Sequence, residues 1–325
     1  MVRDVSIEII KKCPNKCIYC STISDIDSEI LFTYEKVKEI VDDLEGMGIE
    51  RICLSGGEPF LHLNIIDIVK HICAKNIRVD IYSSGIAYDE SQQISSLDKD
   101  LLKQLHKFGL KRIMFNMQAL DEDVYDEIMN TKGNFKFLLQ SIKNTQEAGI
   151  ETEIHFVPMT INFKQISKMI HFVEKEKINQ ISFLRLIAHG RAKDNERELL
   201  LSEQENIDLK NELICLRARY PFIRIGIPLG LNDSISKCNA GRTKLYIKFD
   251  GSVLGCEAFK YFDLFHQKLK IIPDNIHARR VSEILMRSEY LSQEELFITS
   301  HLIDCSEREC SENCPIQNYM KKRGM

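Results

Sequence analysis

The sequence predicts an α/β fold: a partial (β/α)6 TIM-type barrel followed by a small, cysteine-rich α+β extension. The first observation is a loose repeat, in which an amphipathic helical stretch ends in Gly or Asn and passes directly into an apolar strand five times. Gly and Asn accept the left-handed conformation that ends many helices. The second observation is the spacing of these junctions, 28, 33, 40 and 30 residues, which is about the size of one βα unit.

The predicted strands lie at these junctions and at the start of the chain. Helices that alternate with apolar strands predict a parallel sheet covered by helices. Six strands are too few to close an eight-stranded barrel, so an open barrel is expected. The six strand-bearing segments are residues 5–10, 46–54, 76–82, 109–115, 149–156 and 179–184.

The pattern changes after about residue 230, where Gly, Pro, Asn and Ser concentrate over 228–236. We therefore expect a barrel domain over 1–230 and an extension over 231–325. In the extension, two apolar stretches flank Asp250-Gly251, a strong two-residue hairpin signal. A helical stretch near 281–289 precedes the cysteine-rich end.

Composition limits the class of protein. The chain of 325 residues is 44% apolar, so it can bury a sizeable core. Its net charge of −4 comes without a block of like charges, so we expect no nucleic-acid partner. No signal peptide and no apolar run of about 20 residues is found, so we expect no membrane partner and a cytoplasmic location. Its 11 cysteines then predict thiols or metal ligands rather than disulfides.

Three of these cysteines, Cys13, Cys17 and Cys20, share one loop directly after the first strand. Three thiolates can hold three irons of a four-iron cluster. Iron–sulfur clusters are normally closed by four cysteines, so this loop predicts either a distant fourth ligand or an open iron. A zinc site or a closed cluster is the alternative.

Other polar and small residues follow the remaining strands. Active sites of such barrels gather at the C-terminal ends of the strands, so we expect these residues to converge on the cysteine loop. They are Gly56, Gly57, Glu58 and Pro59 after strand two, Ser83 and Ser84 after strand three, Asn116 and Gln118 after strand four, 157–159 after strand five, and Arg185 after strand six.

The loop Cys13-x3-Cys17-x2-Cys20, with Tyr19 before its last cysteine, resembles the cluster loop of radical S-adenosylmethionine (SAM) enzymes. The segment Leu54-Ser-Gly-Gly-Glu-Pro59 resembles the element with which that superfamily holds the methionine end of SAM. The resemblance implies catalysis at a 4Fe–4S cluster on Cys13, Cys17 and Cys20. SAM would be cleaved there to a 5′-deoxyadenosyl radical, which takes a hydrogen atom from the substrate.

The resemblance also implies roles for the strand-end residues in binding SAM. Gly56 and Gly57 would let the backbone approach the methionine moiety, and Glu58 would accept from its ammonium group. Tyr19 would lie near the adenine, and Arg185 would meet the carboxylate. The ribose hydroxyls would be bound by Ser83, Ser84, Asn116 and Gln118. Loop capping and a salt bridge at a strand end are the structural alternatives for these polar residues.

A second metal site is expected in the extension, because thiolate-only ligation selects zinc or an iron–sulfur cluster. The region resembles the SPASM and shorter twitch extensions of radical SAM enzymes, but it has five cysteines where a full SPASM pattern has seven. One auxiliary 4Fe–4S cluster fits better than two clusters or zinc. The resemblance gives its ligands as Cys238, Cys256, Cys314 and either Cys305 or Cys310.

Enzymes with such extensions are often peptide maturases, so the first expectation is a peptide or protein substrate, as in maturation of a ribosomally made precursor (RiPP). The alternative is a small-molecule oxidoreductase, such as a dehydrogenase of a sugar or cyclitol alcohol. No leader-binding domain is expected, because the barrel begins near residue 5. A nucleotide-cyclising enzyme is disfavoured, because the cysteine spacing of the second cluster of such relatives and their C-terminal Gly-Gly are missing from this sequence. A flavodoxin or ferredoxin would be the reducing partner.

The sequence predicts structural roles for four further residues. His155 alternates with apolar neighbours, which favours a buried core histidine over a substrate ligand. Cys53, Cys73 and Cys215 lie in apolar strand or helix patterns and are expected to be buried. A role for Cys215 as a hydrogen-atom donor is the alternative.

Overall fold

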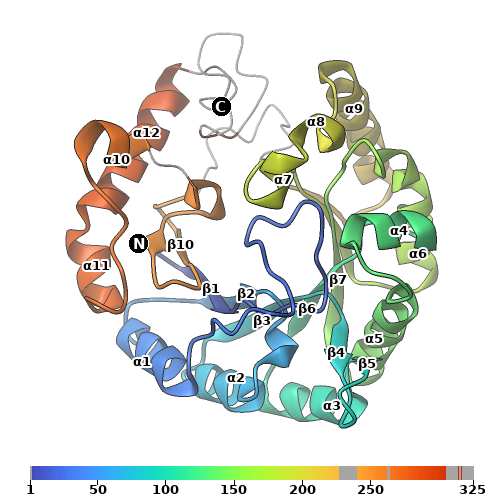
Figure 1. The fold of residues 1–325 in the computed structure, drawn as a ribbon, viewed down its shortest axis with the longest axis horizontal. Helices are drawn as coiled ribbons and strands as arrows, with labels where there is room; N and C mark the ends of the chain where they lie inside the picture. Colours follow the sequence, from blue (N-terminus) through green and yellow to red (C-terminus); the bar gives the residue numbers. More distant parts are fainter. Residues whose placement is uncertain (1, 227–239, 262–263, 305–313, 315, 317–325) are drawn as a thin grey trace.

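The structure, a computed structural model, describes residues 2–226, 240–261, 264–304, 314 and 316. A single curved sheet forms the centre of the molecule and bends around the loops at its C-terminal edge (Figure 1). Every neighbouring pair of its strands is parallel except β10 and β11. In sheet order the strands are β11 (Val253–Leu254), β10 (Lys244–Ile247), β1 (Asp4–Ile10), β2 (Arg51–Gly56), β3 (Arg78–Ser83), β6 (Arg112–Asn116), β7 (Glu151–Phe156), β8 (Gln180–Phe183) and β9 (Ile223–Ile225).

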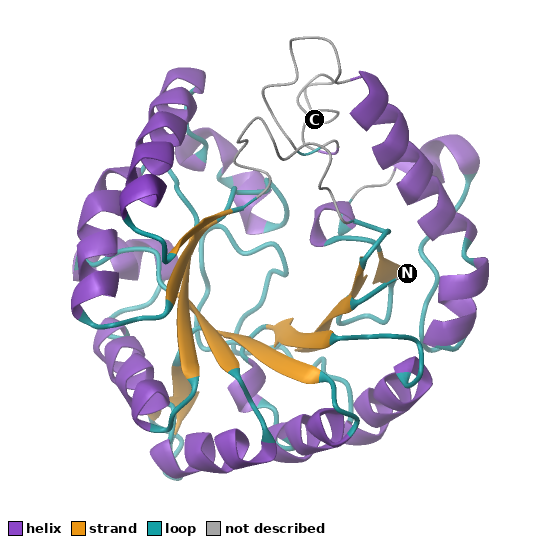
Figure 2. Ribbon diagram, turned by 180° about the vertical axis from the view of Figure 1, so that it is seen from behind, coloured by secondary structure: helices purple, strands orange, loops and turns teal. Residues whose placement is uncertain are grey.

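Helices cover the convex face of the sheet, as the view from behind shows (Figure 2). They bury apolar stripes against it; α1 (Tyr34–Leu44) buries Val37, Ile40 and Val41, for example. The open, mostly parallel arrangement confirms the predicted partial barrel. The other helices are α2 (Ile65–Ala74), α3 (Lys99–Phe108), α4 (Glu122–Met129), α5 (Phe135–Glu147), α6 (Ile166–Lys175), α7 (Arg191–Asp194), α8 (Glu196–Leu199), α9 (Glu203–Arg219), α10 (Leu264–Leu269), α11 (Val281–Arg287) and α12 (Glu289–Asp304), with 3₁₀ turns η1 (Pro59–Leu61), η2 (Phe163–Gln165) and η5 (Glu257–Phe259).

At four of the five helix-to-strand junctions the predicted Gly or Asn has the left-handed conformation, and at the fifth it does not. Gly48, Asn76, Gly109 and Gly149 have positive φ, as expected for residues that end a helix. The prediction for Asn179 was wrong, because the left-handed residue there is Lys177, with φ of 53°. Asn179 instead accepts a hydrogen bond from the Thr152 backbone through Oδ1 at 2.8 Å, so it ties β8 to β7.

Two elements were not predicted. A two-stranded hairpin of β4 (Ile86–Tyr88) and β5 (Ile94–Ser96) lies between β3 and α3. The short edge strand β9 extends the sheet beyond β8. No helix in the described part of the chain is both long enough and apolar enough to span a membrane.

The extension joins the same sheet as the barrel. Its hairpin forms at Asp250-Gly251 as predicted, and β10 pairs in parallel with β1 on the side away from β2. The predicted helical stretch is present as α11 and the start of α12. The expected boundary at 228–236 lies outside the described residues, so the division into 1–230 and 231–325 stays a prediction.

A buried ion pair connects the extension to the barrel. Lys260 donates from Nζ to Glu8 Oε1 at 2.8 Å and to Thr22 Oγ1 at 2.9 Å, and both charged side chains are 2% exposed. A third contact reaches Ser21 Oγ at 3.2 Å. Burial alone would raise the pKa of Glu8, but the charge and hydrogen bond of Lys260 outweigh it and lower that pKa. Glu8 therefore stays ionised beside the cysteine loop.

Replacing Lys260 with Met should destabilise the fold by about 3–5 kcal/mol at neutral pH, because the buried charge of Glu8 then has no cation to balance it. The loss should shrink as the pH falls, since the contribution of a carboxylate with a lowered pKa disappears as it is protonated. Urea unfolding of the two proteins at several pH values measures this. Lys193→Met is the control, because its ion pair with Glu196 is exposed and worth under about 1 kcal/mol. Equal losses in both variants would contradict the prediction.

Candidate active site

A cavity of about 300 Å³ lies where the C-terminal ends of the barrel strands meet. Because parallel strands end at one edge of a sheet, residues far apart in the sequence line it together. It collects most of the residues that the sequence singled out. These are Cys13, Cys17, Tyr19, Cys20, Gly56, Gly57, Ser83, Ser84, Asn116, Gln118 and Arg185.

The three cysteines of the loop are positioned on the cavity wall. Cys13 and Cys17 are each 7% exposed, and Cys20 is half-buried. Burial raises the pKa of Cys13, and the charges of Cys17 and Glu58 raise it further. Burial and the charge of Cys20 likewise raise the pKa of Cys17 to about 12. Thiols packed this closely lose their protons only when positive charge arrives between them, which bound iron provides.

The donor set fits a four-iron cluster. Each thiolate of such a cluster binds a different iron, so the sulfurs surround the cluster instead of meeting at one point. In the described residues no three His, Cys, Asp or Glu side chains converge in the way that a single metal ion requires. Three sulfur ligands on one buried loop provide what three irons need and leave the fourth for another ligand.

The end of β2 packs directly on the root of the cysteine loop. Gly57 donates its backbone N–H to Ile10 O at 2.6 Å, and Glu58 donates to Lys12 O at 2.8 Å. A Cβ on Gly56 would lie 2.1 Å from Ile10 O, and one on Gly57 would lie 2.1 Å from Lys12 O. The glycines are therefore required by a close approach of backbone to backbone within the chain. Their predicted contact with methionine stays a prediction.

Glu58 is fully buried behind the cavity wall, and its carboxylate is bonded within the protein. One oxygen accepts from the N–H and the hydroxyl of Ser84, both at 2.6 Å, and the other accepts from the Ser83 hydroxyl at 2.9 Å and the Phe60 N–H at 3.1 Å. Burial, opposed by these hydrogen bonds, raises the pKa of Glu58 to about 7. Glu58 therefore fixes the loop after β3, and its predicted contact with the SAM ammonium stays a prediction. Pro59 opens η1 beside it and is buried.

A polar network connects the ends of β6 and β7 under the cavity. Asn116 Oδ1 accepts from the Tyr19 hydroxyl and from Gln118 Nε2, the latter at 2.6 Å. Gln118 also donates to His155 O at 3.0 Å and accepts from Val157 N at 2.7 Å. These amides are thus held in one orientation. Their predicted contacts with ribose are not tested by this geometry, nor is the predicted contact of Arg185 with the SAM carboxylate.

The sequence analysis missed the segment that clamps the cysteine loop from outside. Arg191 at the start of α7 donates from Nε to Cys17 O and from Nη2 to Ser24 O, both at 2.7 Å. Its own N–H donates to Cys20 O at 3.1 Å, and Asn195 Nδ2 donates to Ile18 O at 2.8 Å. Four contacts to loop carbonyls therefore fix the backbone that carries the thiols.

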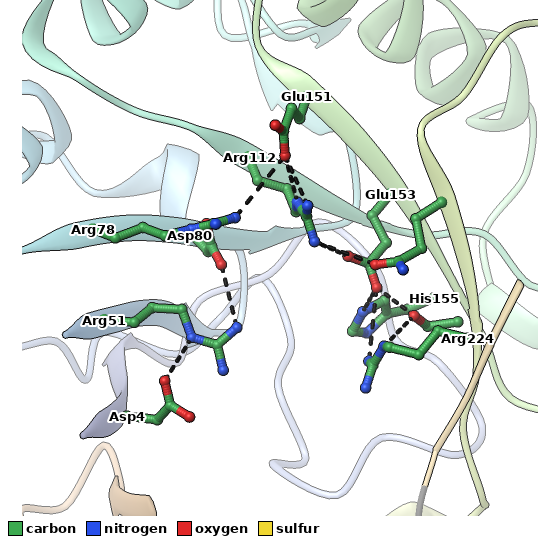
Figure 3. A network of polar contacts seen from close by, with 11 residues as sticks. Asp4, Arg51, Arg78, Asp80, Arg112, Glu151, Glu153, His155 and Arg224 are labelled. Carbon is green, nitrogen blue, oxygen red and sulfur yellow. Dashed lines mark hydrogen bonds and ion pairs between the residues drawn. The ribbon is translucent and has the colours of Figure 1, made fainter. Parts of the chain in front are cut away.

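His155 on β7 and Glu257 in η5 also line the cavity; Glu257 was not predicted, and a place in the site was the disfavoured alternative for His155. His155 is buried as predicted, at 5% exposure, but it also lines the cavity. It belongs to a chain of charged side chains that crosses the inner face of the sheet from Asp4 to Arg224 (Figure 3). No local sequence pattern distinguishes a cavity-lining histidine from a core histidine on the same strand.

The cysteines of the extension are described only in part. Cys256 and Cys314 are packed among the aromatic side chains of a second apolar cluster, which includes Phe259 and Phe297. Burial and the charges of Glu257 and Cys314 raise the pKa of Cys256 to about 12. Cys238, Cys305 and Cys310 lie outside the described residues, so the proposed ligand set stays a prediction.

Of the three cysteines expected in the core, Cys53 is buried and Cys73 is half-buried. The prediction for Cys215 was wrong, because it lies exposed on α9. It is not among the residues that line the cavity. Helix α9 buries only Leu209 and Leu213 and has apolar side chains on its other sides as well, so its sequence pattern does not mark one buried face.

Comparison with known proteins identifies the family to which this site belongs. The profile of the Radical SAM superfamily matches residues 7–173. Fe-coproporphyrin III synthase of Methanosarcina barkeri is 28% identical over 202 residues, 61% of this chain, but the chain spans only about half (48%) of that relative. GTP 3′,8-cyclase of Clostridium perfringens is 23% identical over 309 residues, 89% of this chain and 90% of the cyclase.

Among solved structures, Streptococcus suis SuiB bound to S-adenosylmethionine superposes with a TM-score of 0.71 at 16% identity, over 91% of this chain and 68% of SuiB. SuiB bound to precursor peptide SuiA gives the same TM-score at 15% identity, over 91% of this chain and 67% of SuiB. At these identities the likeness shows a shared fold.

Replacing Gly57 with Ala should prevent the close approach of β2 to the cysteine loop, because the new Cβ meets backbone oxygens on two residues, Lys11 and Lys12. We expect a loss of iron uptake and a stability loss of about 2–4 kcal/mol from overpacking and broken hydrogen bonds. Gly46→Ala is the matched control: its Cβ meets nothing within 4 Å, so it carries only the penalty of about 1–2 kcal/mol for a left-handed residue. Full iron loading of Gly57→Ala would contradict this account.

Replacing Arg191 with Met should leave the fold intact but loosen the cysteine loop. Two charged hydrogen bonds to carbonyls are lost, each worth about 1.5–3 kcal/mol. We expect faster alkylation of Cys17 and Cys20 in the iron-free protein, read by mass spectrometry, and weaker retention of iron. Arg197→Met, on the exposed face of α8, should match the parent protein. The same alkylation rate in both variants would rule out the clamp.

Proposed function

The chain belongs to the Radical SAM superfamily, and from that membership we propose that it is an enzyme that abstracts a hydrogen atom from a peptide or protein substrate. The superfamily uses a 4Fe–4S cluster and SAM. One observation carries the assignment to this cavity. Three thiols, a glycine backbone edge and a ring of fixed polar groups, drawn from all six predicted strands, surround a single space of about 300 Å³.

When bound, the cluster and SAM supply the electron and the radical that removes hydrogen from the substrate. The protein has three tasks of its own. Cys13, Cys17 and Cys20 would hold the iron, and Arg191 and the Gly56–Gly57 edge keep their loop in place. Tyr19, Asn116 and Gln118 present polar atoms whose orientation is already set, which reduces the entropy lost on binding SAM. The buried wall limits water around the reacting atoms.

A peptide substrate is supported by the fold. This chain matches SuiB over 91% of its length, and SuiB has been solved bound to SAM and, in another structure, bound to a precursor peptide. We propose maturation of a ribosomally made peptide on this basis. We propose that a flavodoxin or ferredoxin delivers the electron and that the protein acts in the cytoplasm.

We further propose that the extension carries one auxiliary 4Fe–4S cluster of the SPASM or twitch type. Cys256 and Cys314 lie near enough for their charges to interact; Cys314 is buried and Cys256 is half-buried. Cys256 is followed directly by Glu257, which lines the main cavity. The auxiliary site would therefore adjoin the substrate. Cys238 and one of Cys305 or Cys310 complete the proposed ligand set.

Two other substrate classes are candidates. The cyclase of Clostridium perfringens is similar over nearly its whole length, so cyclisation of a nucleoside triphosphate has direct support from sequence. Oxidation of a sugar or cyclitol alcohol remains the small-molecule alternative from the sequence analysis. A panel of short peptides, GTP and myo-inositol, each added to the reduced enzyme with SAM, separates the three. The class that increases 5′-deoxyadenosine formation and gives a new product on chromatography is the substrate class.

Anaerobic reconstitution with iron and sulfide tests both metal sites. We expect about eight irons per chain, and about four in Cys17→Ala and in Cys256→Ala. Cleavage of SAM by dithionite-reduced protein should disappear in Cys17→Ala, because its first cluster lacks a ligand, and SAM binding should persist in Cys256→Ala. Cys215→Ala, an exposed cysteine on α9, is the control and should keep all eight.

SAM cleavage by Cys17→Ala would overturn the assignment of the first site. Only about four irons in the parent protein would remove the auxiliary cluster from the proposal while leaving the enzyme assignment intact.

A further inference from the structure

His155 combines features that the SAM-binding residues do not explain. It lines the cavity from β7, its ring packs edge-on against Tyr82 with centroids 4.7 Å apart, and its Nε2 lies 3.0 Å from Glu153 Oε1. Its backbone oxygen, and not its ring, takes part in the amide network of Gln118. The ring therefore has a buried carboxylate on one side and the cavity on the other.

The protonation states of this pair follow from the charges around it. Glu153 is held by Arg112 Nη1 at 2.9 Å, by the Ser182 hydroxyl and by Arg224 Nη2 at 3.7 Å (Figure 3). Burial alone would raise the pKa of Glu153, but the contacts with His155, Ser182 and Arg224 outweigh burial and lower it to about 2. Burial lowers the pKa of His155, aided by Arg224 and opposed by Glu153 and Glu257. The stable pair is thus a carboxylate and a neutral imidazole.

The tautomer follows from the carboxylate. An ionised carboxylate only accepts hydrogen bonds, so Nε2 carries the proton and donates to Glu153. Nδ1 is then an acceptor, and it makes no hydrogen bond to the residues that the structure describes. It is not one of the buried polar atoms without a partner, so it is open to the cavity that His155 lines and can accept from a donor that arrives there.

A purely structural role accounts for less of this geometry. Arg112, Arg224 and Ser182 also contact Glu153, so the carboxylate has three partners besides the imidazole. The arrangement is typical of a catalytic base: the carboxylate of Glu153 fixes Nε2 of the imidazole and leaves Nδ1 for a reacting partner.

We propose that His155 is a substrate-contacting residue, whose Nδ1 accepts a hydrogen bond from a hydroxyl group next to the carbon that loses its hydrogen. This inference rests on the proposed function and adds the chemistry of the substrate. In a reaction that removes the hydroxyl proton, that proton moves to Nδ1, the oxygen keeps the electron pair, and Glu153 stabilises the imidazolium. The hydroxyl belongs either to a serine-like side chain of a peptide or to a cyclitol.

Chemical labelling tests the geometry without a known substrate. Diethyl pyrocarbonate acylates unprotonated imidazole nitrogens, and peptide mapping of the reconstituted enzyme locates the label. We expect labelling of His155 at Nδ1 and none of His62, because both nitrogens of His62 are engaged, by Phe32 O and Asn64 N. Exposed His171 reports that the reagent is active. An unlabelled His155 beside a labelled His171 would overturn the proposal.

Protection tests the substrate class. With SAM present, the blocked peptide Ala-Ser-Ala or myo-inositol should slow labelling of His155, whereas blocked Ala-Ala-Ala should not. Protection by the serine peptide alone identifies a peptide source, and protection by inositol alone identifies a cyclitol. Protection by neither probe, or equally by Ala-Ala-Ala, would refute recognition of a hydroxyl.

The variant His155→Gln separates substrate contact from cofactor binding. Its amide nitrogen can still donate to Glu153, but it lacks Nδ1. We expect iron content and SAM affinity to match the control His171→Gln, and stimulation of SAM cleavage by the protecting probe to be lost. Loss of SAM affinity in His155→Gln would assign the residue to the cofactor instead. Iron content and probe-free cleavage of the parent protein report separately on the enzyme assignment.

Discussion

The contact between two backbones, at the end of β2 and at the root of the cysteine loop, is the constraint on which the site depends. A sheet of parallel strands already places the two segments at one edge, but the N–H groups of Gly57 and Glu58 reach the carbonyls of Ile10 and Lys12 only because no side chain intervenes. Two further sets of hydrogen bonds hold the segments on either side of this contact. Glu58 fixes the serines after β3, and the loop meets the clamp of Arg191 on its other side.

The inner face of the sheet has two chemically different halves. Near the N-terminal ends of the strands, carboxylates and guanidiniums alternate across neighbouring strands, from Asp4 and Arg51 through Asp80 to Arg112 and Glu151 (Figure 3). Opposite charges balance pair by pair, so the barrel interior is filled without an apolar plug. Toward the C-terminal ends this network gives way to thiols, hydroxyls and amides. Glu153 and His155 lie where the two halves meet.

Much of this could be predicted from local sequence. The strands, the hairpin at Asp250-Gly251 and the convergence of strand ends follow from period, turn chemistry and the geometry of parallel sheets. Contacts between distant segments do not. Arg191 meets Cys17 across 174 residues, and no pattern around Arg191 indicates that partner. Glu58 was identified, but its bonds to Ser83 and Ser84 depend on how β2 and β3 pair. At the fifth junction Lys177 has the left-handed conformation, and Asn179 accepts a hydrogen bond from Thr152 on the neighbouring strand.

The pairing of β1 with β10 has a consequence for how the protein is made. Strand β1 lies inside the finished sheet, yet its partner on one side begins at Lys244 and is synthesised much later. Until that segment appears, one edge of β1 keeps its peptide groups unpaired, and Glu8 lacks the Lys260 ammonium beside the cysteine loop. Pairings across so many residues form late and leave an edge open to other chains. Cells that produce this protein would therefore benefit from a chaperone that shields an exposed strand. Delivery of iron before synthesis is complete would meet an unfinished site.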